Sequence, residues 1–293
     1  MPILLRAILT VLSGCVLGHH YLAAATAQTG ASSHLDAMKS MYRREPPRPI
    51  ANQPLVDLGR ELFFDPTLSA SGKTACVTCH LPQLGWAVTE AKSRNDSGKL
   101  TSRRSQPLIG IGHAAVPFGW DGRNPTLEAQ AKSSVATGSM SMNATPTPVK
   151  VEVIEERFRS NAAYVTKFKA ALGDAPINID TIAQAVAAFE RTLEPAVAPF
   201  DRWIEGDESA ISGAAKRGFE LYNGKALCFT CHRGWRFTDD LFHDIGTTTT
   251  DRGRGAVVTN DPSLQFAFKT PTLRDVALRP PYMHHGLQAT LVE

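Results

Sequence analysis

The sequence has few cysteines, almost no net charge and no long apolar run in its main part. Its five cysteines are too few for a disulfide-dense scaffold, which favours a chemical role for them over a structural one. Lys and Arg number 31 against 28 for Asp and Glu, without a long basic run, which gives no reason to expect a nucleic acid or an anionic membrane surface as partner. A hydrophobic fraction of 43% over 293 residues excludes global disorder, and no segment after residue 27 is apolar enough for a membrane span.

The N-terminus has the features of a secretory signal peptide over residues 1–27. Arg6 supplies the positive charge, residues 7–17 are apolar, and Ala25-Thr26-Ala27 fits a cleavage site between small residues. We therefore expect a soluble protein in the periplasm. The segment that ends at Cys15 also fits a lipobox, so a lipid anchor at Cys15 is the alternative.

The remaining pattern predicts a mainly α protein with long loops. Residues 28–53 are polar and rich in proline, which favours an extended lead-in. Apolar residues then recur at helical spacing in segments around Leu58, Leu127, Phe168, Val186 and Phe219. We expect Asn124-Pro125 to start the second of these helices, Gly173 to end the third and Ser212 to cap the last. No convincing run alternates with the period of a strand.

A five-residue motif occurs twice, and it accounts for every cysteine but Cys15. The two copies are Cys76-Val77-Thr78-Cys79-His80 and Cys228-Phe229-Thr230-Cys231-His232, and their first cysteines are 152 positions apart. A similar segment precedes each copy, and a tryptophan segment, at Trp86 or Trp235, follows it. The sequence therefore predicts a duplicated unit with one copy in each of two domains, and a boundary near residues 195–212.

The motif Cys-x-x-Cys-His is the attachment signature of c-type haem. Its two thiols add to the vinyl groups of the porphyrin, and the adjacent histidine ligates the iron. A four-thiolate zinc site and two redox disulfides are the rival interpretations. Zinc does not need the histidine, and a redox pair normally follows a strand, so two haems held by Cys76, Cys79, Cys228 and Cys231 are favoured.

The motif also nominates His80 and His232 as proximal ligands of the two irons. The other axial position decides the function, because a strong sixth ligand makes an electron carrier and an open face makes a peroxide or oxygen site. Spacing alone does not identify the residue on that face.

Further blocks occur in a fixed order around the two motifs. They are Gly59 to Asp65, Gly119 to Arg123, Ala188 to Leu193, Pro199 to Trp203, Phe268 to Arg274 and Pro281 to Gly286. With these blocks, the chain from about Leu58 to Glu293 resembles the bacterial di-haem cytochrome c peroxidase family, in its MauG-like branch. The resemblance implies two cytochrome c-like helical domains with one covalent c-type haem each, a peroxidatic one over residues 54–200 and an electron-transfer one over 201–293.

The resemblance also implies an oxidoreductase that reduces hydrogen peroxide at the N-terminal haem. Trp120 matches the tryptophan that relays electrons from the C-terminal haem, and Gln130 matches a glutamine of the peroxide pocket. The electrons would come from a small periplasmic cytochrome c or cupredoxin, or from a protein substrate oxidised at long range. Trp86 and Trp235 are expected to pack beside the haems.

The N-terminal half departs from the family pattern on the distal side. Residues 95–101 lack the displaceable histidine of the usual peroxidases, which implies a permanently open iron. His113 is the candidate substitute, but its apolar surroundings favour a structural histidine. Residues 138–143 lack the pocket carboxylate, and a general acid or base is typically worth about 10²–10⁴-fold in rate.

The chain also departs from the family pattern in its metal ligands. Ser105 stands where the family has an asparagine that helps to hold calcium between the haems, and carbonyls at Arg279 and Pro281 would then bind calcium more weakly. The family's distal ligand to the second haem would fall past Glu293, so we expect this domain to be truncated or to use another group, and Met283 is not assigned that role. A di-haem electron-transfer cytochrome without peroxidase activity is the alternative function, and a pure docking module is the least favoured.

Overall fold

The computed structural model describes residues 34–141, 149–248 and 250–292. The predicted signal peptide, Cys15, and the last two residues of the 138–143 segment lie outside these residues. Within the described ranges, no helix is both long and apolar enough to cross a membrane. By its internal packing the chain forms two compact units, one from residues 45–197 with 228–293 and a smaller one from residues up to 44 with 198–227.

The smaller unit is built from three short helical segments. They are residues 34–40, α7 (Pro199–Ile204) and α8 (Gly213–Asn223), which Ser212 caps as predicted. The helix at 34–40 differs from the extended lead-in predicted for 28–53, because its side chains find tertiary partners. Lys39 Nζ lies 4.3 Å from the ring centroid of Trp203, and the hydroxyl of Tyr42 donates to Asn223 over 2.6 Å.

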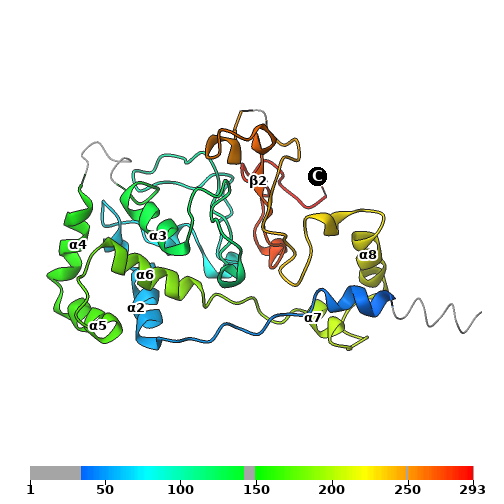
Figure 1. Ribbon diagram of the computed structural model, residues 1–293, viewed down its shortest axis with the longest axis horizontal. Coiled ribbons are helices and arrows are strands. Elements are labelled where there is room, and N and C mark those ends of the chain that lie inside the picture. The colour runs from blue at the N-terminus through cyan, green and yellow to red at the C-terminus, as the bar shows by residue number, and fades with distance from the viewer. Residues whose placement is uncertain (1–33, 142–148, 249, 293) are drawn as a thin grey trace, which may run out of the picture. The chain divides into compact units, whose positions relative to one another are not determined.

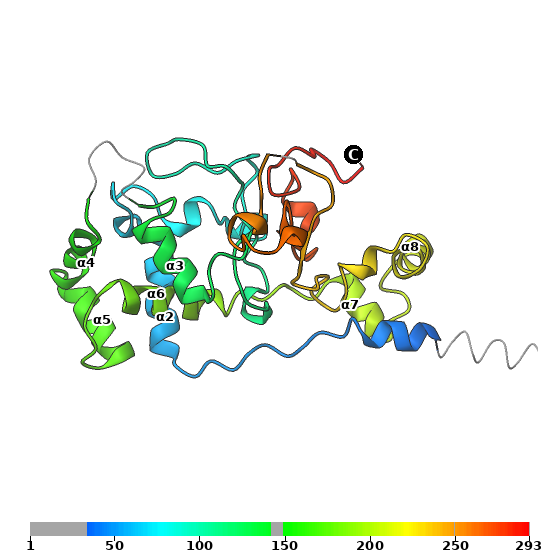
Figure 2. The same cartoon turned by 45° about the horizontal axis from the view of Figure 1, so that its top comes forward.

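The larger unit contains the remaining helices and both Cys-x-x-Cys-His motifs. Its α-helices are α2 (Gln53–Phe64), α3 (Leu127–Ala136), α4 (Val151–Arg159), α5 (Ala162–Leu172) and α6 (Ile179–Glu190). Two-residue strands, β1 (Phe242–His243) and β2 (Phe268–Lys269), pair in antiparallel fashion. Figures 1 and 2 show α2 and α6 crossing, with α3 beside α6 and long loops leading to β2. The mainly helical fold is confirmed.

Most predicted helix ends agree with the structure, and one does not. Gly173 ends α5 with a φ of 66°, a left-handed value that glycine adopts at little cost. The start of α3 was predicted at Asn124, but the cap is Thr126, whose hydroxyl accepts from the amide of Ala129 over 3.0 Å. Asn124 instead forms an isolated bridge with Phe118, which keeps it outside the helix.

The core of the larger unit lies where α2 and α6 cross. A Cβ added to Gly59 would lie 1.8 Å from the carbonyl oxygen of Ala185, so glycine is what lets the two backbones approach. Leu58, Leu62 and Ile182 are almost fully buried around this crossing. The apolar residues whose spacing predicts the two helices are therefore the residues through which the helices pack together.

Two loops of this unit share one local structure. Phe118 bridges Asn124 in the first loop, and Tyr282 bridges Gln288 in the second, in both cases antiparallel. The amide of the aromatic residue donates across each bridge, over 2.6 Å and 2.7 Å respectively. The same antiparallel bridge over six residues also closes the loops at Leu81–Ala87 and Arg94–Leu100.

Each of the two loops accepts a long-range backbone hydrogen bond from another segment. The amide of Arg104 donates to the carbonyl of His284 over 3.0 Å, and the amide of Lys269 donates to the carbonyl of Trp120 over 2.8 Å. Trp120 and His284 lie beside each other, with ring centroids 6.3 Å apart.

The split into domains 54–200 and 201–293 stays a prediction. The chain passes between the two compact units after residues 44, 197 and 227, and both cysteine motifs lie in the larger one.

Candidate functional site

Both Cys-x-x-Cys-His motifs fold into a single 3₁₀ turn, at Cys76–Thr78 and at Cys228–Thr230. In each turn the amide of the histidine donates to the carbonyl of the first cysteine, over 3.0 Å for His80 and 2.9 Å for His232. Among the described residues, none of the four cysteines forms a disulfide. The turns therefore bring two thiols and one imidazole together on a short arc of chain, twice.

The two histidines are oriented in the same way. Nδ1 of His80 lies 3.0 Å from the carbonyl oxygen of Trp86, and Nδ1 of His232 lies 2.9 Å from that of Phe237. Because a carbonyl only accepts, Nδ1 carries the proton of each neutral ring and Nε2 keeps its lone pair. Burial lowers the pKa of both imidazoles, which favours this neutral form that can ligate a metal.

The structural partner of Trp86 is Phe237 rather than Trp235, the residue that the sequence repeat pairs with it. Trp86 and Phe237 both accept from a motif histidine, and both have left-handed φ angles, 60° and 54°. Trp235 is buried and packs edge-on against His113, with ring centroids 4.9 Å apart.

Each motif lines a cavity in the larger unit. Cys76, Cys79 and His80 line one of about 310 Å³, the N-terminal cavity. Cys231 and His232 line one of about 220 Å³, the C-terminal cavity. Much of the N-terminal wall is apolar, from Leu68, Leu108, Phe118, Leu127, Val135, Met140, Ile182 and Val186. Cysteine thiols outside disulfides, an imidazole whose Nε2 keeps its lone pair and apolar walls fit a porphyrin bound through thioethers.

Trp120 lines both cavities. Its indole Nε1 donates to the carbonyl of Arg104 over 2.9 Å, and its own carbonyl accepts from Lys269. The side chain and the backbone are thus held separately, which fixes the ring between the two cavities.

Gln130 lies on α3 and lines the N-terminal cavity. Its side-chain amide donates to the hydroxyl of Ser134 one turn later, over 3.1 Å. Ser139 and Met140 line the same cavity, and the sulfur of Met140 lies 3.9 Å from that of Cys76. Among the described residues of the 138–143 segment, the side chains at the cavity are therefore a hydroxyl and a thioether.

A carboxyl group that the sequence analysis did not assign lies at this cavity. Glu190, the last residue of α6, lines it and is 4% exposed, and its Oε2 has no hydrogen-bond partner. Burial raises the pKa of Glu190 to about 8. The helical spacing indicates that Glu190 is buried, because it follows Ile182 and Val186 at four-residue intervals on the buried face of α6.

His113 is a structural histidine in this arrangement. Its Nε2 lies 2.7 Å from a carboxylate oxygen of Glu194 and its Nδ1 3.2 Å from one of Glu45. It does not line either cavity.

His284 lines the C-terminal cavity, as does Met283. The imidazole of His284 is 4% exposed and stacks on Phe268 with centroids 3.6 Å apart. Its Nε2 has no hydrogen-bond partner, and burial lowers its pKa to about 4, so the ring is neutral.

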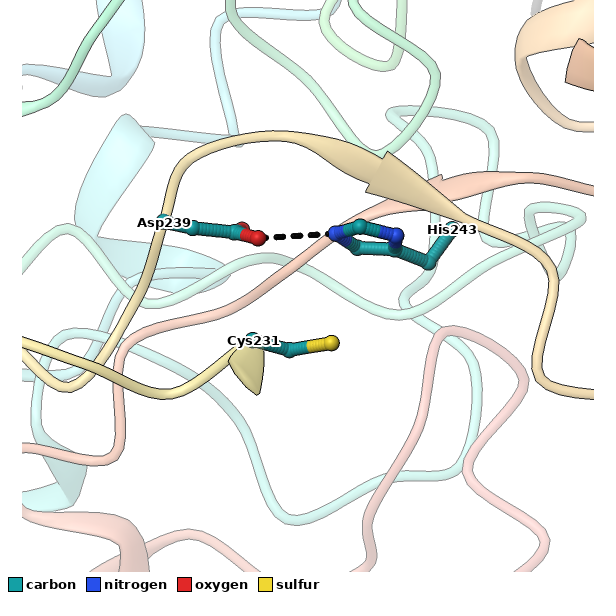
Figure 3. Close-up of side chains that lie close together, drawn as sticks. All are labelled: Cys231, Asp239 and His243. Carbon is teal, nitrogen blue, oxygen red and sulfur yellow. Dashed lines mark hydrogen bonds and ion pairs between the residues drawn. The ribbon is translucent and has the colours of Figure 1, made fainter. Parts of the chain in front are cut away.

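A second group at the C-terminal cavity combines Cys231, Asp239 and His243 (Figure 3). Their ligand atoms lie within 4.8 Å of one another, and Nε2 of His243 lies 2.8 Å from a carboxylate oxygen of Asp239. Attachment of a c-type haem consumes the thiol of Cys231. The group then reduces to an Asp239–His243 pair, which is not a metal centre.

Two of the three expected calcium donors are engaged by protein groups. The hydroxyl of Ser105 lies 2.7 Å from that of Ser93, and the carbonyl of Arg279 accepts from the guanidinium of Arg104 over 3.2 Å. These contacts leave calcium binding a prediction, with fewer available oxygens than a typical site of six to eight ligands.

The comparisons with known proteins decide the family. Residues 53–209 match the family model described as di-haem cytochrome c peroxidase. The chain belongs to this family. It is 41% identical to the methylamine utilization protein MauG of Methylorubrum extorquens, over 99% of this chain and 83% of that protein. It is also 41% identical to MauG of Methylophilus methylotrophus, over 89% of this chain and 78% of that protein.

A solved structure agrees with this assignment. A MauG-like protein associated with microbial copper homeostasis superposes with a TM-score of 0.74 and 28% identity, over 85% of this chain and 78% of that one. The chain is therefore an oxidoreductase with two c-type haems and cytochrome c-like helical architecture.

Proposed function

We propose that this protein reduces hydrogen peroxide in its N-terminal cavity, with electrons relayed from the C-terminal cavity through Trp120. The observation that carries the proposal is the position of Trp120, whose side chain lines both cavities. His80 and His232 would hold the two irons through Nε2, and Cys76, Cys79, Cys228 and Cys231 would form the thioethers.

The haem of the N-terminal cavity would supply an iron that binds and activates peroxide. The role of His80 is to present a neutral nitrogen, held in orientation by the carbonyl of Trp86. Gln130, on the wall of the same cavity, would donate its side-chain N–H to a peroxide molecule in the cavity once it releases Ser134. Glu190 holds a proton at neutral pH, and its free Oε2 makes it a proton source at this wall.

Trp120 would act as the conduit because it is fixed in place. Its indole N–H donates to the carbonyl of Arg104. This hydrogen bond would hold the ring in one position while an electron passes through it. An aromatic ring between two redox sites is suited to a stepwise transfer. The remaining wall of the N-terminal cavity is largely apolar, which limits the entry of water.

We further propose that the protein works in the periplasm, exported by the signal peptide over 1–27. A lipid anchor at Cys15 is the alternative. Its electrons would come from a small periplasmic cytochrome c or cupredoxin, or from a protein substrate oxidised at long range, as in the MauG-like branch. The near balance of charges gives no support to a nucleic acid partner.

The test is to follow peroxide consumption and the Soret band after mixing the purified di-haem protein with peroxide and a reduced small cytochrome c. We expect turnover, and we expect it to fall about tenfold or more in Gln130→Leu. Gln184→Leu is the matched control, because Gln184 is an exposed residue of α6 that lines neither haem cavity. The absence of both peroxide consumption and a spectral change would overturn the proposal.

The second candidate is a di-haem electron-transfer cytochrome without peroxidase activity. The described wall of the 138–143 segment favours it, since Ser139 and Met140 offer no carboxylate there. Electron paramagnetic resonance of the oxidised protein separates the two functions. One high-spin ferric signal indicates an open iron and supports the peroxidase, whereas two low-spin signals support the electron carrier.

A further inference from the structure

Two arginines are buried together without an anion. Arg104 is 5% exposed and Arg279 is 6% exposed. The carbonyls of Arg279 and Val88 accept from the guanidinium of Arg104, and those of Thr272 and Arg274 accept from that of Arg279. Among the described residues, Nε of each arginine has no hydrogen-bond partner. Within the described part of the chain, neither arginine forms an ion pair.

Such a pair is costly as it stands. Arginine is almost never fully buried unless it is paired, because carbonyl dipoles satisfy N–H groups without cancelling the charge. Burial lowers the pKa of Arg279 to about 10, and repulsion between the two cations adds to this effect. Asp275 and Glu90 attract the two guanidiniums without forming an ion pair with them in the described part of the chain. Two adjacent buried cations that lack an ion-pair partner there indicate that an anion belongs in the space beside them.

The space beside them is identified by the cavities. Arg279 lines the C-terminal cavity, whereas Arg104 lines both the C-terminal and the N-terminal cavity. The C-terminal cavity also contains Cys231 and His232, which hold the edge and the iron of a c-type haem in the proposed function. A porphyrin of this type carries two carboxylates on the edge away from its thioethers, and a guanidinium matches a carboxylate in geometry as well as in charge.

We propose that Arg104 and Arg279 form a carboxylate-binding pair for the acidic groups of the C-terminal haem, with Arg104 shared by both haems. The proposal rests on the haem attachment stated under the proposed function, but not on peroxide reduction. Each arginine would keep its carbonyl contacts and offer its free N–H groups to the carboxylate. A cation held at this edge favours the ferrous form, because the ferric haem carries one more positive charge.

The test is a potentiometric titration of both haems in the absence of peroxide. In Arg279→Gln we expect the redox equilibrium of the C-terminal haem to shift at least tenfold toward the ferric form, about 59 mV for one electron, with a smaller change at the N-terminal haem. In Arg104→Gln we expect both haems to shift in this direction. Arg279→Lys keeps the charge and should restore most of the potential. Arg159→Gln removes an exposed charge on α4 that lines neither cavity, and it should change neither haem.

A pyridine haemochrome assay shows whether each variant contains both haems. If a variant lacks a haem, a second measurement on the wild-type protein still tests the proposal. In the wild-type protein, replacing chloride by phosphate at constant ionic strength should leave both potentials unchanged if the haem's own carboxylates occupy the pair. A potential that follows the phosphate concentration would show that the arginines bind a free anion. That result, or an Arg279→Gln variant with unchanged potentials, overturns the proposal whether or not the protein turns over peroxide.

Discussion

At the scale of single residues, the site depends on side chains that are buried in one defined protonation state. His80, His232 and His284 are neutral because burial lowers their pKa values, and Glu190 is neutral because burial raises its pKa. Neutral imidazoles can offer a lone pair, and a neutral carboxyl group can offer a proton. The cavities therefore hold ligands and a proton donor that are ready at pH 7.

Replacing Trp120 tests the relay. Trp120→Phe keeps an aromatic ring but loses the hydrogen bond to the carbonyl of Arg104 and much of the surface that lines both cavities. We expect electron transfer between the haems to slow by roughly tenfold or more, which corresponds to a barrier about 1.4 kcal/mol higher. Stopped-flow spectroscopy of the reduced protein after mixing with peroxide measures the rate of this electron transfer. Trp203→Phe, the same change in the smaller unit, should leave the rate unaltered, and equal rates in all three proteins would rule out the relay.

The carboxyl group of Glu190 predicts a pH-dependent stability. Its pKa is about 8 in the folded protein against an ordinary 4.5, so the folded state holds a proton that the unfolded state has lost between these values. The free energy of unfolding should therefore fall as pH rises from about 4.5 to about 8. Urea unfolding at the two ends of this range checks the slope, and Glu190→Gln should flatten it. A slope that persists unchanged in the variant would assign it to other groups.

At the scale of elements, glycine determines how closely helices can pack. Gly59 of α2 lies directly against the backbone of α6, whereas Gly218 of α8 has nothing within 4 Å of an added Cβ. The two glycines occur in similar sequence segments that precede the two cysteine motifs. One is required by a helix crossing and the other is an ordinary exposed glycine.

The two glycines make a matched pair for mutation. Gly59→Ala should destabilise the protein by about 3 kcal/mol or more, because α2 and α6 must separate or shift. Gly218→Ala should stabilise it by roughly 0.5–1 kcal/mol through the better helix propensity of alanine. Thermal unfolding of both variants measures the difference. Similar effects at the two sites would contradict the crossing.

A loop contact beside Trp120 can be tested in the same way. Asp121 is 1% exposed and is bonded by Arg103 and Arg123, and Arg103 also pairs with Asp251 at 2.7 Å. Arg103→Met leaves Asp121 with one partner, so we expect a loss toward the lower end of the about 3–5 kcal/mol for a broken buried pair. Arg123→Met, at a 59% exposed side chain, should cost clearly less. Denaturant midpoints of the two variants decide this.

At the scale of the whole molecule, the sequence predicts the helices better than the walls of the cavities. The period of Leu55, Leu58 and Leu62 is enough for α2, because a buried helical face needs only local spacing. The burial of His284 and Arg279 is set by segments far away in the chain, which a single sequence does not reveal.

The functional residues also divide into those that the sequence alone indicates and those that it does not. The cysteines and histidines of the two motifs are recognisable from their spacing alone. Trp120 and Gln130 could be nominated only through the family resemblance, since an isolated tryptophan or glutamine has no pattern. The helix at residues 34–40 and the cap at Thr126 were missed, because tertiary partners and a competing bridge override the local signals.

The effect of removing calcium is a prediction for the molecule as a whole. Because Ser105 and the carbonyl of Arg279 already have protein partners, we expect chelation of calcium to leave the Soret band and both haem potentials unchanged. Equilibrium dialysis against a chelator, followed by readdition of calcium, measures this. Loss of the spectrum with the chelator and its return with calcium would show that a calcium site exists.

The two long-range backbone bonds beside Trp120 and His284 have a consequence for folding. Arg104 and Trp120 belong to the first half of the chain, but their partners His284 and Lys269 lie near its end. Contacts of such long sequence separation form late, after the local helices. The aromatic ring between the cavities is therefore one of the last features to be positioned, and a polypeptide emerging N-terminus first has both cysteine motifs available for modification before that ring is in place.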